Sequence, residues 1–275
     1  MKTESTTLRV LTLNLWNGCG DVERRMDVAI AQVRALQPDI IGLQEVVQHP
    51  PEGLQQAQAF ARAVDGDYRF AAADPESPGG PIGNAVISRL PIGEHHSMML
   101  PSPPGDPRVA VAVEVKTPLG ALCFVSTHLS WELDASPVRE RQVVALDGFA
   151  RKHKKDLPSI MTGDFNAAPD ADCIRFLTGR CSLEGKGTYW RDAFARIHPH
   201  GDGYTWSANN PYVARHVERN RRIDFIFVGP IGLDERGAIV DARVVLDMPG
   251  HDGVFASDHF AVYTEIDLES RPGGL

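Results

Sequence analysis

The sequence LRVLTLNL at residues 8–15 alternates apolar and polar side chains, which is the pattern of a half-buried β-strand. Residues 21–36 follow with the spacing of an amphipathic helix, for which Asp21 is a suitable N-cap. The apolar positions of this helix are Val22, Met26, Ala29, Ile30 and Val33. Pro38 ends the helix, and the apolar run DIIGLQEV at residues 39–46 predicts a buried strand. Two polar residues, Asn14 and Glu45, therefore fall at strand ends.

The same alternation of helices and strands continues along the chain, with β-rich runs in the middle. We predict helices near residues 54–64, 137–154 and 170–177. The predicted strands are residues 68–72, 84–88, 93–100, 109–116, 122–128, 159–164, 223–228, 240–246 and 259–266. This order predicts an α/β protein with mixed sheets covered by helices. The Pro- and Gly-rich stretches are too short for a linker, so residues 1–275 are expected to form a single domain.

Composition narrows the class of protein. With 43% hydrophobic and 23% charged residues, the chain has an ordinary globular composition. It shows no signal peptide and no apolar run of membrane-spanning length, so we expect a soluble, cytoplasmic protein without a membrane span. The four cysteines form no CxxC pair, which argues against a zinc site or a disulfide framework. The sequence leaves the oligomeric state open.

The net charge of −8 disfavours nucleic acid as a partner, because phosphate contacts need clustered Lys and Arg side chains. It does not exclude a nucleic-acid substrate, since an acidic enzyme can keep a local basic rim. Two basic runs exist, at residues 152–155 and 215–222. The first closes a predicted helix, where cations are favoured by the helix dipole. The second leads into Arg222-Ile223-Asp224 and is either a solvated loop or a substrate contact.

Eight polar residues end a predicted strand or begin the loop after it. They are Asn14, Glu45, His128, Asp164, Asn166, Asp224, Asp258 and His259. Residues at strand ends can meet at one point although they lie far apart in the sequence. Each of them alone has a structural explanation nearly as good as a functional one, but their shared position predicts an active site.

The chemistry of these residues suits a phosphoester. Glu45 follows a buried apolar run, where a carboxylate is costly unless a cation or hydrogen-bond donors satisfy it, and Mg²⁺ or Mn²⁺ would do so. Asp164 and Asn166 lie two residues apart, so the pleat of a strand would turn both to one side; an Asx turn is the alternative. An Asp that accepts a hydrogen bond from a histidine fixes the tautomer of that ring, as Asp224 or Asp258 would for His259.

These residues and their neighbours resemble the endonuclease/exonuclease/phosphatase superfamily. The resemblance spans nearly the whole chain. Its motifs are Leu13-Asn14, Gln44-Glu45-Val46, residues 83–89 (GNAVISR), Thr127-His128-Leu129, Gly163-Asp164-Phe165-Asn166, Arg222-Ile223-Asp224-Phe225 and Ser257-Asp258-His259. The resemblance implies a DNase I-like fold, which is a four-layer αββα sandwich of two mixed β-sheets flanked by helices. It implies a metal-dependent phosphoesterase with its site in a cleft at one edge of the sheets.

The resemblance also implies roles for the eight residues. Glu45, assisted by Asn14 and Asp258, would hold Mg²⁺ or Mn²⁺. Asp164 would orient or deprotonate the attacking water, with Asn166 beside the phosphate. His128 and His259, the latter positioned by Asp224, would bond the phosphate oxygens. The expected reaction is in-line attack by water on the phosphorus, aided by one metal ion.

In two respects the sequence departs from relatives in that superfamily. Residues 78–83 of this sequence, before Asn84, contain no acid that would pair with His128. Pancreatic-type DNase has an acid in this segment that pairs with its histidine. His128 also stands where abasic-site enzymes use a tyrosine, which makes that subfamily a poorer match.

The acidic charge favours a small phosphoester or a lipid headgroup as substrate. Three tryptophans, Trp16, Trp131 and Trp206, are candidates for the mouth of the cleft, where they would stack on a base, a ring or an acyl chain. Packing at the rim is an equally good explanation. The alternatives are a DNA or RNA nuclease on the same fold and a catalytically inactive binding protein.

Overall fold

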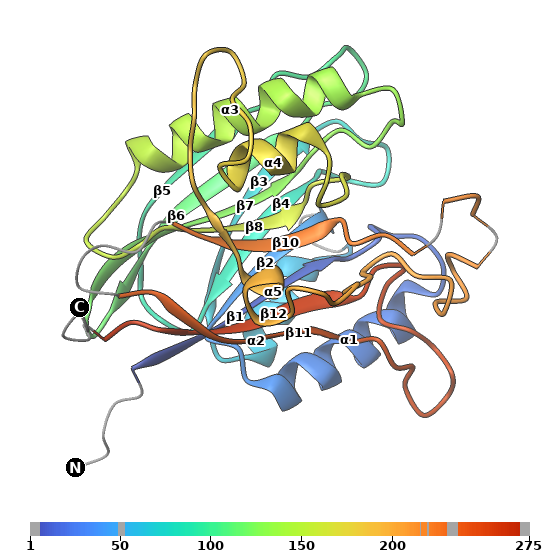
Figure 1. Ribbon diagram of the computed structural model, residues 1–275. Coiled ribbons are helices and arrows are strands. Elements are labelled where there is room, and N and C mark those ends of the chain that lie inside the picture. Colours follow the sequence, from blue (N-terminus) through green and yellow to red (C-terminus); the bar gives the residue numbers. More distant parts are fainter. Residues whose placement is uncertain (1–5, 49–52, 215, 219, 230–235, 270–275) are drawn as a thin grey trace.

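The computed structural model describes residues 6–48, 53–214, 216–218, 220–229 and 236–269, and these form two β-sheets packed face to face with helices outside (Figure 1). From edge to edge, the first sheet contains β11 (Ala238–Val245), β12 (Ala261–Asp267), β1 (Thr7–Asn14), β2 (Ile40–Val47), β4 (Ile82–Ser88) and β3 (Asp67–Asp74). The second contains β5 (Ile92–Met99), β6 (Val109–Thr117), β7 (Gly120–His128), β8 (Ile160–Asp164), β10 (Asp224–Val228) and β9 (Arg191–Asp192).

Helices cover the outer face of each sheet. Helices α1 (Val22–Leu36) and α2 (Gln56–Ala63) lie below the first sheet in the view of Figure 1, and α3 (Ser136–Lys152) and α4 (Asp172–Leu177) lie above the second. Strands β1 and β2 are parallel, as are β7 and β8, and in each pair a helix makes the crossover. The other strand pairs are antiparallel. The predicted fold class, two mixed sheets flanked by helices, is confirmed.

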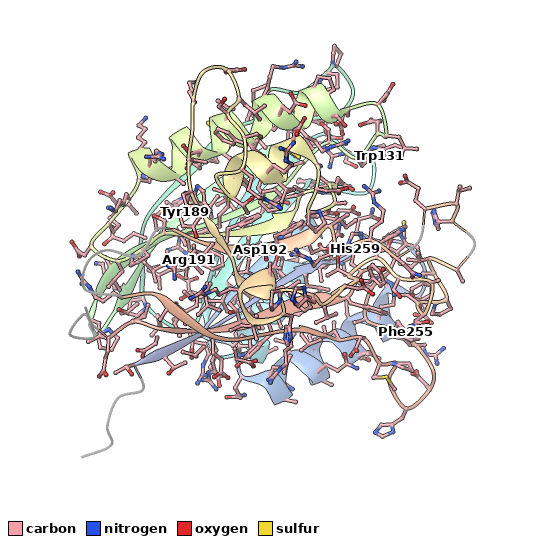
Figure 2. The ribbon with its side chains drawn as sticks, in the orientation of Figure 1. Trp131, Tyr189, Arg191, Asp192, Phe255 and His259 are labelled. Carbon is pink, nitrogen blue, oxygen red and sulfur yellow. The ribbon has the colours of Figure 1, made fainter. Side chains whose placement is uncertain are left out.

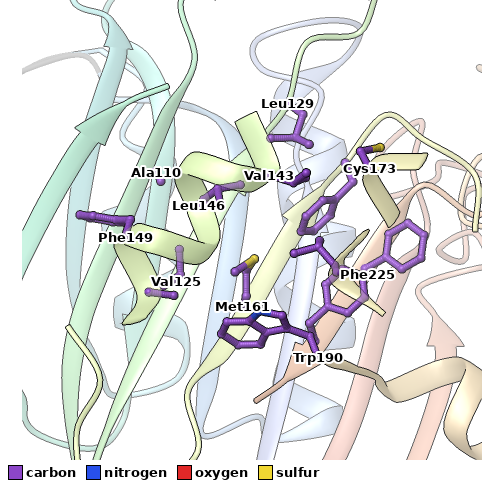
Figure 3. Packing of buried hydrophobic residues seen from close by; sticks show 14 of the residues in the cluster. Ala110, Val125, Leu129, Val143, Leu146, Phe149, Met161, Cys173, Trp190 and Phe225 are labelled. Atoms are coloured by element: carbon purple, nitrogen blue, oxygen red, sulfur yellow. The ribbon is translucent and has the colours of Figure 1, made fainter. Parts of the chain in front are cut away.

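Three layers of apolar side chains correspond to the three interfaces of this sandwich. The layer between the sheets contains Val10, Ile40, Val86, Phe124 and Ile226. A second layer joins α3 and α4 to the second sheet through Leu146, Phe149 and Met161 among others, as Figure 3 shows. The third joins α1 and α2 to the first sheet. No helix in the described segments is long and apolar enough to cross a membrane.

A local signal explains where α1 begins. Asp21 accepts a hydrogen bond from the backbone N–H of Arg24, so it caps α1 as predicted. Strand β9 and the short helix α5 (Ala193–Ile197) were not predicted. The two residues of β9 are charged yet buried, because Arg191 donates to the carbonyls of Gly229 and Gly237 and Asp192 pairs with Arg222. Such distant partners leave no pattern in the sequence.

The sheets approach closely at Gly42 in β2. A Cβ atom added there would lie 2.1 Å from the hydroxyl of Thr162, which is fully buried in β8 and donates to the carbonyl of Val125. We expect Gly42→Ala to lower the free energy of unfolding by about 2 kcal/mol, because overpacking a tight core forces neighbouring groups to move. Urea unfolding followed by circular dichroism measures this change.

Gly148 offers the matched control. It lies on the exposed side of α3, and an added Cβ would meet no atom within 4 Å. Gly148→Ala should stabilise the protein by about 0.5–1 kcal/mol, since alanine loses less backbone entropy in a helix. Equal effects of the two substitutions would contradict the close approach of the sheets at Gly42.

Candidate active site

The eight predicted site residues lie together at one edge of the two sheets. Asn14 ends β1, His128 ends β7 and Asp164 ends β8. Asp224 begins the antiparallel strand β10 and is the register partner of Asp164. Asp258 and His259 precede β12, and Glu45 lies in β2. Because parallel strands end, and antiparallel strands begin, at the same edge, the topology alone brings these residues to one place.

Asn14 connects the two sheets. Its amide nitrogen donates to Glu45 Oε1 at 3.1 Å in the first sheet and to Asp164 Oδ2 at 3.0 Å in the second. Its carbonyl oxygen accepts from the backbone N–H of Trp16 at 2.9 Å. This buried side chain therefore fixes the separation of two carboxylates that come from opposite sheets.

Glu45 has a left-handed backbone with φ 52°, and the pairing of β2 with β4 shifts register between Leu43 and Val46 around it. Trp16 (φ 54°) and Asn17 (φ 39°) are also left-handed, and Asn17 donates to Glu45 Oε2 at 3.0 Å. A non-glycine residue in this region costs about 1–3 kcal/mol and persists only where its surroundings enforce it. The left-handed backbone of Glu45 therefore lies at the point where the Glu45 carboxylate faces the cleft.

His259 lies between two carboxylates. Its Nδ1 is 2.9 Å from Asp224 Oδ2, and its Nε2 is 3.7 Å from Asp164 Oδ2. Burial alone would lower the pKa of His259, but the charges of Asp224 and Asp164 together with the Asp224 hydrogen bond outweigh burial and raise that pKa well above its usual value. The ring is therefore an imidazolium that donates through Nδ1 to Asp224 and carries a second proton on Nε2.

Asp164 lies at the centre of the cluster. Burial, reinforced by the charge of Asp224, raises the pKa of Asp164, whereas His259, the Asn166 N–H and Asn14 lower it. Its carboxylate can thus hold or release a proton near neutral pH, which suits a group that accepts a proton from water.

His128 is neutral, because burial, followed by the nearby charges of Arg108 and His259, lowers its pKa well below the usual value. The amide nitrogen of Asn166 contacts His128 Nε2 at 3.0 Å and donates to the Leu129 carbonyl at 3.1 Å. Nε2 is therefore the acceptor nitrogen in this arrangement, and the ring proton lies on Nδ1. Asp164 Oδ2 lies 3.4 Å from the same Nε2. The His128 ring is thus oriented by the Asn166 amide as a donor, and not by an acid from residues 78–83.

The strand pleat does not explain how Asp164 and Asn166 come together. Asn166 lies beyond the end of β8 with φ 49°, and its backbone N–H donates to Asp164 Oδ1 at 2.9 Å. The expectation of a shared pleat face is therefore wrong, and the alternative, an Asx turn, is what brings Asn166 beside His128.

The donor set suits a hard divalent cation. Burial first, and then the charge of Glu45, raises the pKa of Asp258 to about 6. Glu45 and Asp258 both face this cleft, and a cation bound by the two carboxylates would offset the repulsion between their charges. Oxygen ligands are those that Mg²⁺ and Mn²⁺ prefer. Asp164, Asp224 and His259 also bring ligand atoms within 4.8 Å of one another. Glu45 and Asp258 offer only oxygen ligands, whereas this cluster includes an imidazole that is bonded to Asp224, so Glu45 and Asp258 are the better fit for a hard ion.

The cluster opens into a cleft of about 710 Å³. Trp16, Trp131 and Trp206 line it, as expected, and Figure 2 shows Trp131 and His259 toward the same edge of the molecule. Two described arginines also line it, and each is paired with an acid: Arg108 with Asp106 and Arg221 with Glu218. Of the basic run at 215–222, Arg222 is buried against Asp192, while Arg215 and Arg219 lie outside the described residues.

Sequence reasoning missed several residues of the site. Asn17 supports Glu45, and Arg108 lies near His128, but a single asparagine in a loop and an arginine before a strand give no distinct signal. Arg25 is different, because it stands three residues after Val22 and four before Ala29 on the apolar face of α1. A charge in that position indicates a buried partner.

Comparison with known proteins agrees with this geometry. The curated Nocturnin of Drosophila melanogaster is 23% identical over 286 residues, which cover 90% of this chain and 42% of that protein. The chain thus spans less than half the length of that relative. The D. rerio TDP2 structure in complex with a single-strand DNA product has a TM-score of 0.77 at 17% identity, over 95% of this chain and 99% of that one.

Two further structures share the fold. The human Nocturnin catalytic domain with bound sulfate has a TM-score of 0.70 at 20% identity, over 94% of this chain and 93% of that one. An endonuclease/exonuclease/phosphatase from Beutenbergia cavernae has a TM-score of 0.71 at 24% identity, covering 96% and 72% of the respective chains. Residues 11–259 match the sequence pattern of one family over most of the chain. The chain belongs to the endonuclease/exonuclease/phosphatase family.

Proposed function

We propose that this chain is a divalent-metal-dependent phosphoesterase that acts as a single domain. The observation that carries the proposal is the position of Asp164, which lies between a charged His259 and a neutral His128 at the base of a cleft that Glu45 and Asp258 also line. The family and the Nocturnin relative support hydrolysis of a phosphoester as the reaction class.

Glu45 and Asp258, with Asn14 holding Glu45 in place, would bind Mg²⁺ or Mn²⁺. Such an ion, when bound, supplies Lewis-acid stabilisation of a phosphoryl oxygen. Asp164 orients a water molecule and accepts its proton as the water oxygen attacks the phosphorus in line with the leaving group. His259, charged and held by Asp224, donates Nε2–H to a phosphoryl oxygen and stabilises the charge that develops there. His128 and Asn166 border the phosphate on the side of Arg108.

Asp224 is a positioning residue in this proposal, because its carboxylate bonds Nδ1 of His259, and its charge also raises the pKa of Asp164. We expect Asp224→Asn to lower kcat by about 100-fold or more, because the amide no longer fixes the ring or holds its charge. Steady-state kinetics with a chromogenic phosphodiester measures the effect. Asp202→Asn, on an exposed loop, is the control, and a similar loss in both variants would contradict the role of Asp224.

For the substrate, we propose a small phosphoester or a lipid headgroup. The net charge of −8 and the pairing of both described cleft arginines with acids disfavour a polyanion. A nuclease is the second candidate, because three tryptophans line the cleft and the fold is shared with a TDP2 that was solved with a DNA product.

A substrate panel separates these candidates. The panel comprises bis(p-nitrophenyl) phosphate, p-nitrophenyl phosphate, single- and double-stranded DNA, RNA, sphingomyelin and phosphoinositides, each with and without Mg²⁺. The proposal expects chelator-sensitive hydrolysis that is fastest on a small phosphoester or a lipid. Faster hydrolysis of nucleic acid would establish the nuclease alternative. Equal rates for wild type and Asp164→Asn on every substrate would point instead to an inactive binding protein.

A further inference from the structure

Arg25 is a buried arginine whose guanidinium binds backbone carbonyl groups. It lies in α1 with 1% of its surface exposed. Nη1 donates to the carbonyls of Leu15 at 2.9 Å and Ala256 at 3.1 Å, and Nε and Nη2 donate to that of Cys19 at 3.0 and 2.7 Å. Nη2 also approaches the carbonyls of Trp16 and Asn17 at 3.4 and 3.3 Å. No described carboxylate forms an ion pair with it.

These carbonyls belong to two loops that flank the proposed metal site, in which Glu45 lies in β2 and Asp258 precedes β12. Residues 15–19 directly follow Asn14, and Asn17 in this loop donates to Glu45 Oε2. Ala256 stands two residues before Asp258. The loop at residues 15–19 follows strand β1, and the loop that contains Ala256 precedes β12. The guanidinium therefore connects two segments about 240 residues apart in the chain.

The loop at 15–19 needs such support. Trp16 and Asn17 both have left-handed backbones, which are unfavourable for a bulky side chain such as that of Trp16. The Arg25 guanidinium also lies over the Trp16 ring at 4.9 Å, and Gln56 donates to the Asn17 carbonyl at 2.9 Å. The arginine donates to the carbonyls of the buried residues Leu15 and Ala256 and adds to the bonds that the Cys19 N–H and Gln56 already make to those of Trp16 and Asn17.

We propose that Arg25 is a positioning residue for the metal site, because its guanidinium fixes the loop that holds Glu45 relative to the loop that holds Asp258. The inference rests on the proposed binding of a divalent ion by these acids. Several carbonyls can be held at once only by a planar fork of donors, so lysine cannot replace arginine here.

The charge of Arg25 and its geometry have opposite consequences for a bound cation. The positive charge lies near Asp258 and Glu45, so by itself it would weaken the binding of Mn²⁺. The hydrogen bonds of Arg25 hold the two loops, and with them Glu45 and Asp258, in position for a cation. Loss of these hydrogen bonds should therefore also weaken the binding of Mn²⁺. Arg25→Lys keeps the charge and loses the fork, whereas Arg25→Met loses both, and together the two variants separate these effects.

Arg191 provides a matched control. It is 8% exposed and likewise donates to backbone carbonyls, those of Gly229 and Gly237. Figure 2 shows it well to the left of His259, away from the cleft edge. Arg191→Lys therefore reports what the loss of a buried carbonyl-binding arginine does to stability without touching the metal site.

The test is the affinity of metal-free protein for Mn²⁺, measured by electron paramagnetic resonance of the free ion. We expect Arg25→Lys and Arg25→Met to raise the Mn²⁺ dissociation constant by about 10- to 100-fold, as supporting residues of metal sites do. Arg191→Lys should leave it within about threefold of wild type. Asn17→Ala, a milder change at a half-buried residue, should also weaken binding, because it removes the link to Glu45.

Three results would overturn the inference. They are an unchanged affinity in Arg25→Lys, a tighter affinity in Arg25→Met, and, if neither arginine variant folds, an unchanged affinity in Asn17→Ala. A wild-type protein that binds no Mn²⁺ is a different result, because it contradicts the proposed metal site itself and removes the basis of this inference.

Discussion

Asp164→Asn should lower kcat for phosphoester hydrolysis by about 10,000-fold or more, the scale on which removal of a catalytic proton acceptor acts. The amide has the same size, so the cleft keeps its shape, but it cannot accept a proton from water. It also removes one of the three carboxylate charges, those of Asp224, Asp164 and Asp258, that raise the pKa of His259. Both effects act on the transition state, so KM should change little.

The measurement is steady-state kinetics on the best substrate of the panel, with residual rates checked by a second preparation to exclude contaminating hydrolase. Asp170→Asn makes the same chemical change on an exposed residue six positions later and should keep wild-type kcat. Equal loss in both variants, or a kcat for Asp164→Asn within tenfold of wild type, would contradict the role of Asp164 as proton acceptor.

Glu45→Gln should abolish measurable binding of Mn²⁺ and lower the rate by about 1,000-fold at millimolar Mg²⁺, because the carboxylate is the charged ligand that a hard cation needs. The glutamine would keep an oxygen on one side of the cleft but would face the amide donors of Asn14 and Asn17 with only one acceptor atom. The variant should therefore lose the metal site without losing its fold.

Isothermal titration with Mn²⁺ and kinetics over a range of Mg²⁺ concentrations measure both effects. Glu184→Gln is the control, since Glu184 also has a left-handed backbone (φ 49°) but is exposed and pairs with Lys186. Wild-type Mn²⁺ affinity in Glu45→Gln would show that the ion is held elsewhere, with the cluster of Asp164, Asp224 and His259 as the remaining candidate.

Periodicity predicted most helices and strands but no sheet order, and it placed three site residues at strand ends correctly, whereas Glu45 lies within β2. Asn14, His128 and Asp164 end apolar runs in the sequence, and the structure ends β1, β7 and β8 at those same residues.

Contacts between distant segments were beyond sequence reasoning. The left-handed backbone of Glu45 and the burial of Arg191 depend on partners that lie elsewhere in the chain. Arg25 is an intermediate case, because its place on an apolar helix face indicates burial, whereas its partners are backbone carbonyls, which carry no residue identity. The sequence thus predicts which residues meet more readily than what holds them.

The most direct test of a metal-dependent phosphoesterase is to titrate metal-free wild type with Mn²⁺ and to follow bound ion and hydrolysis rate in the same samples. The account predicts no hydrolysis without metal and a rate that rises in proportion to the fraction of sites filled. Hydrolysis that persists in full after complete removal of metal would contradict it.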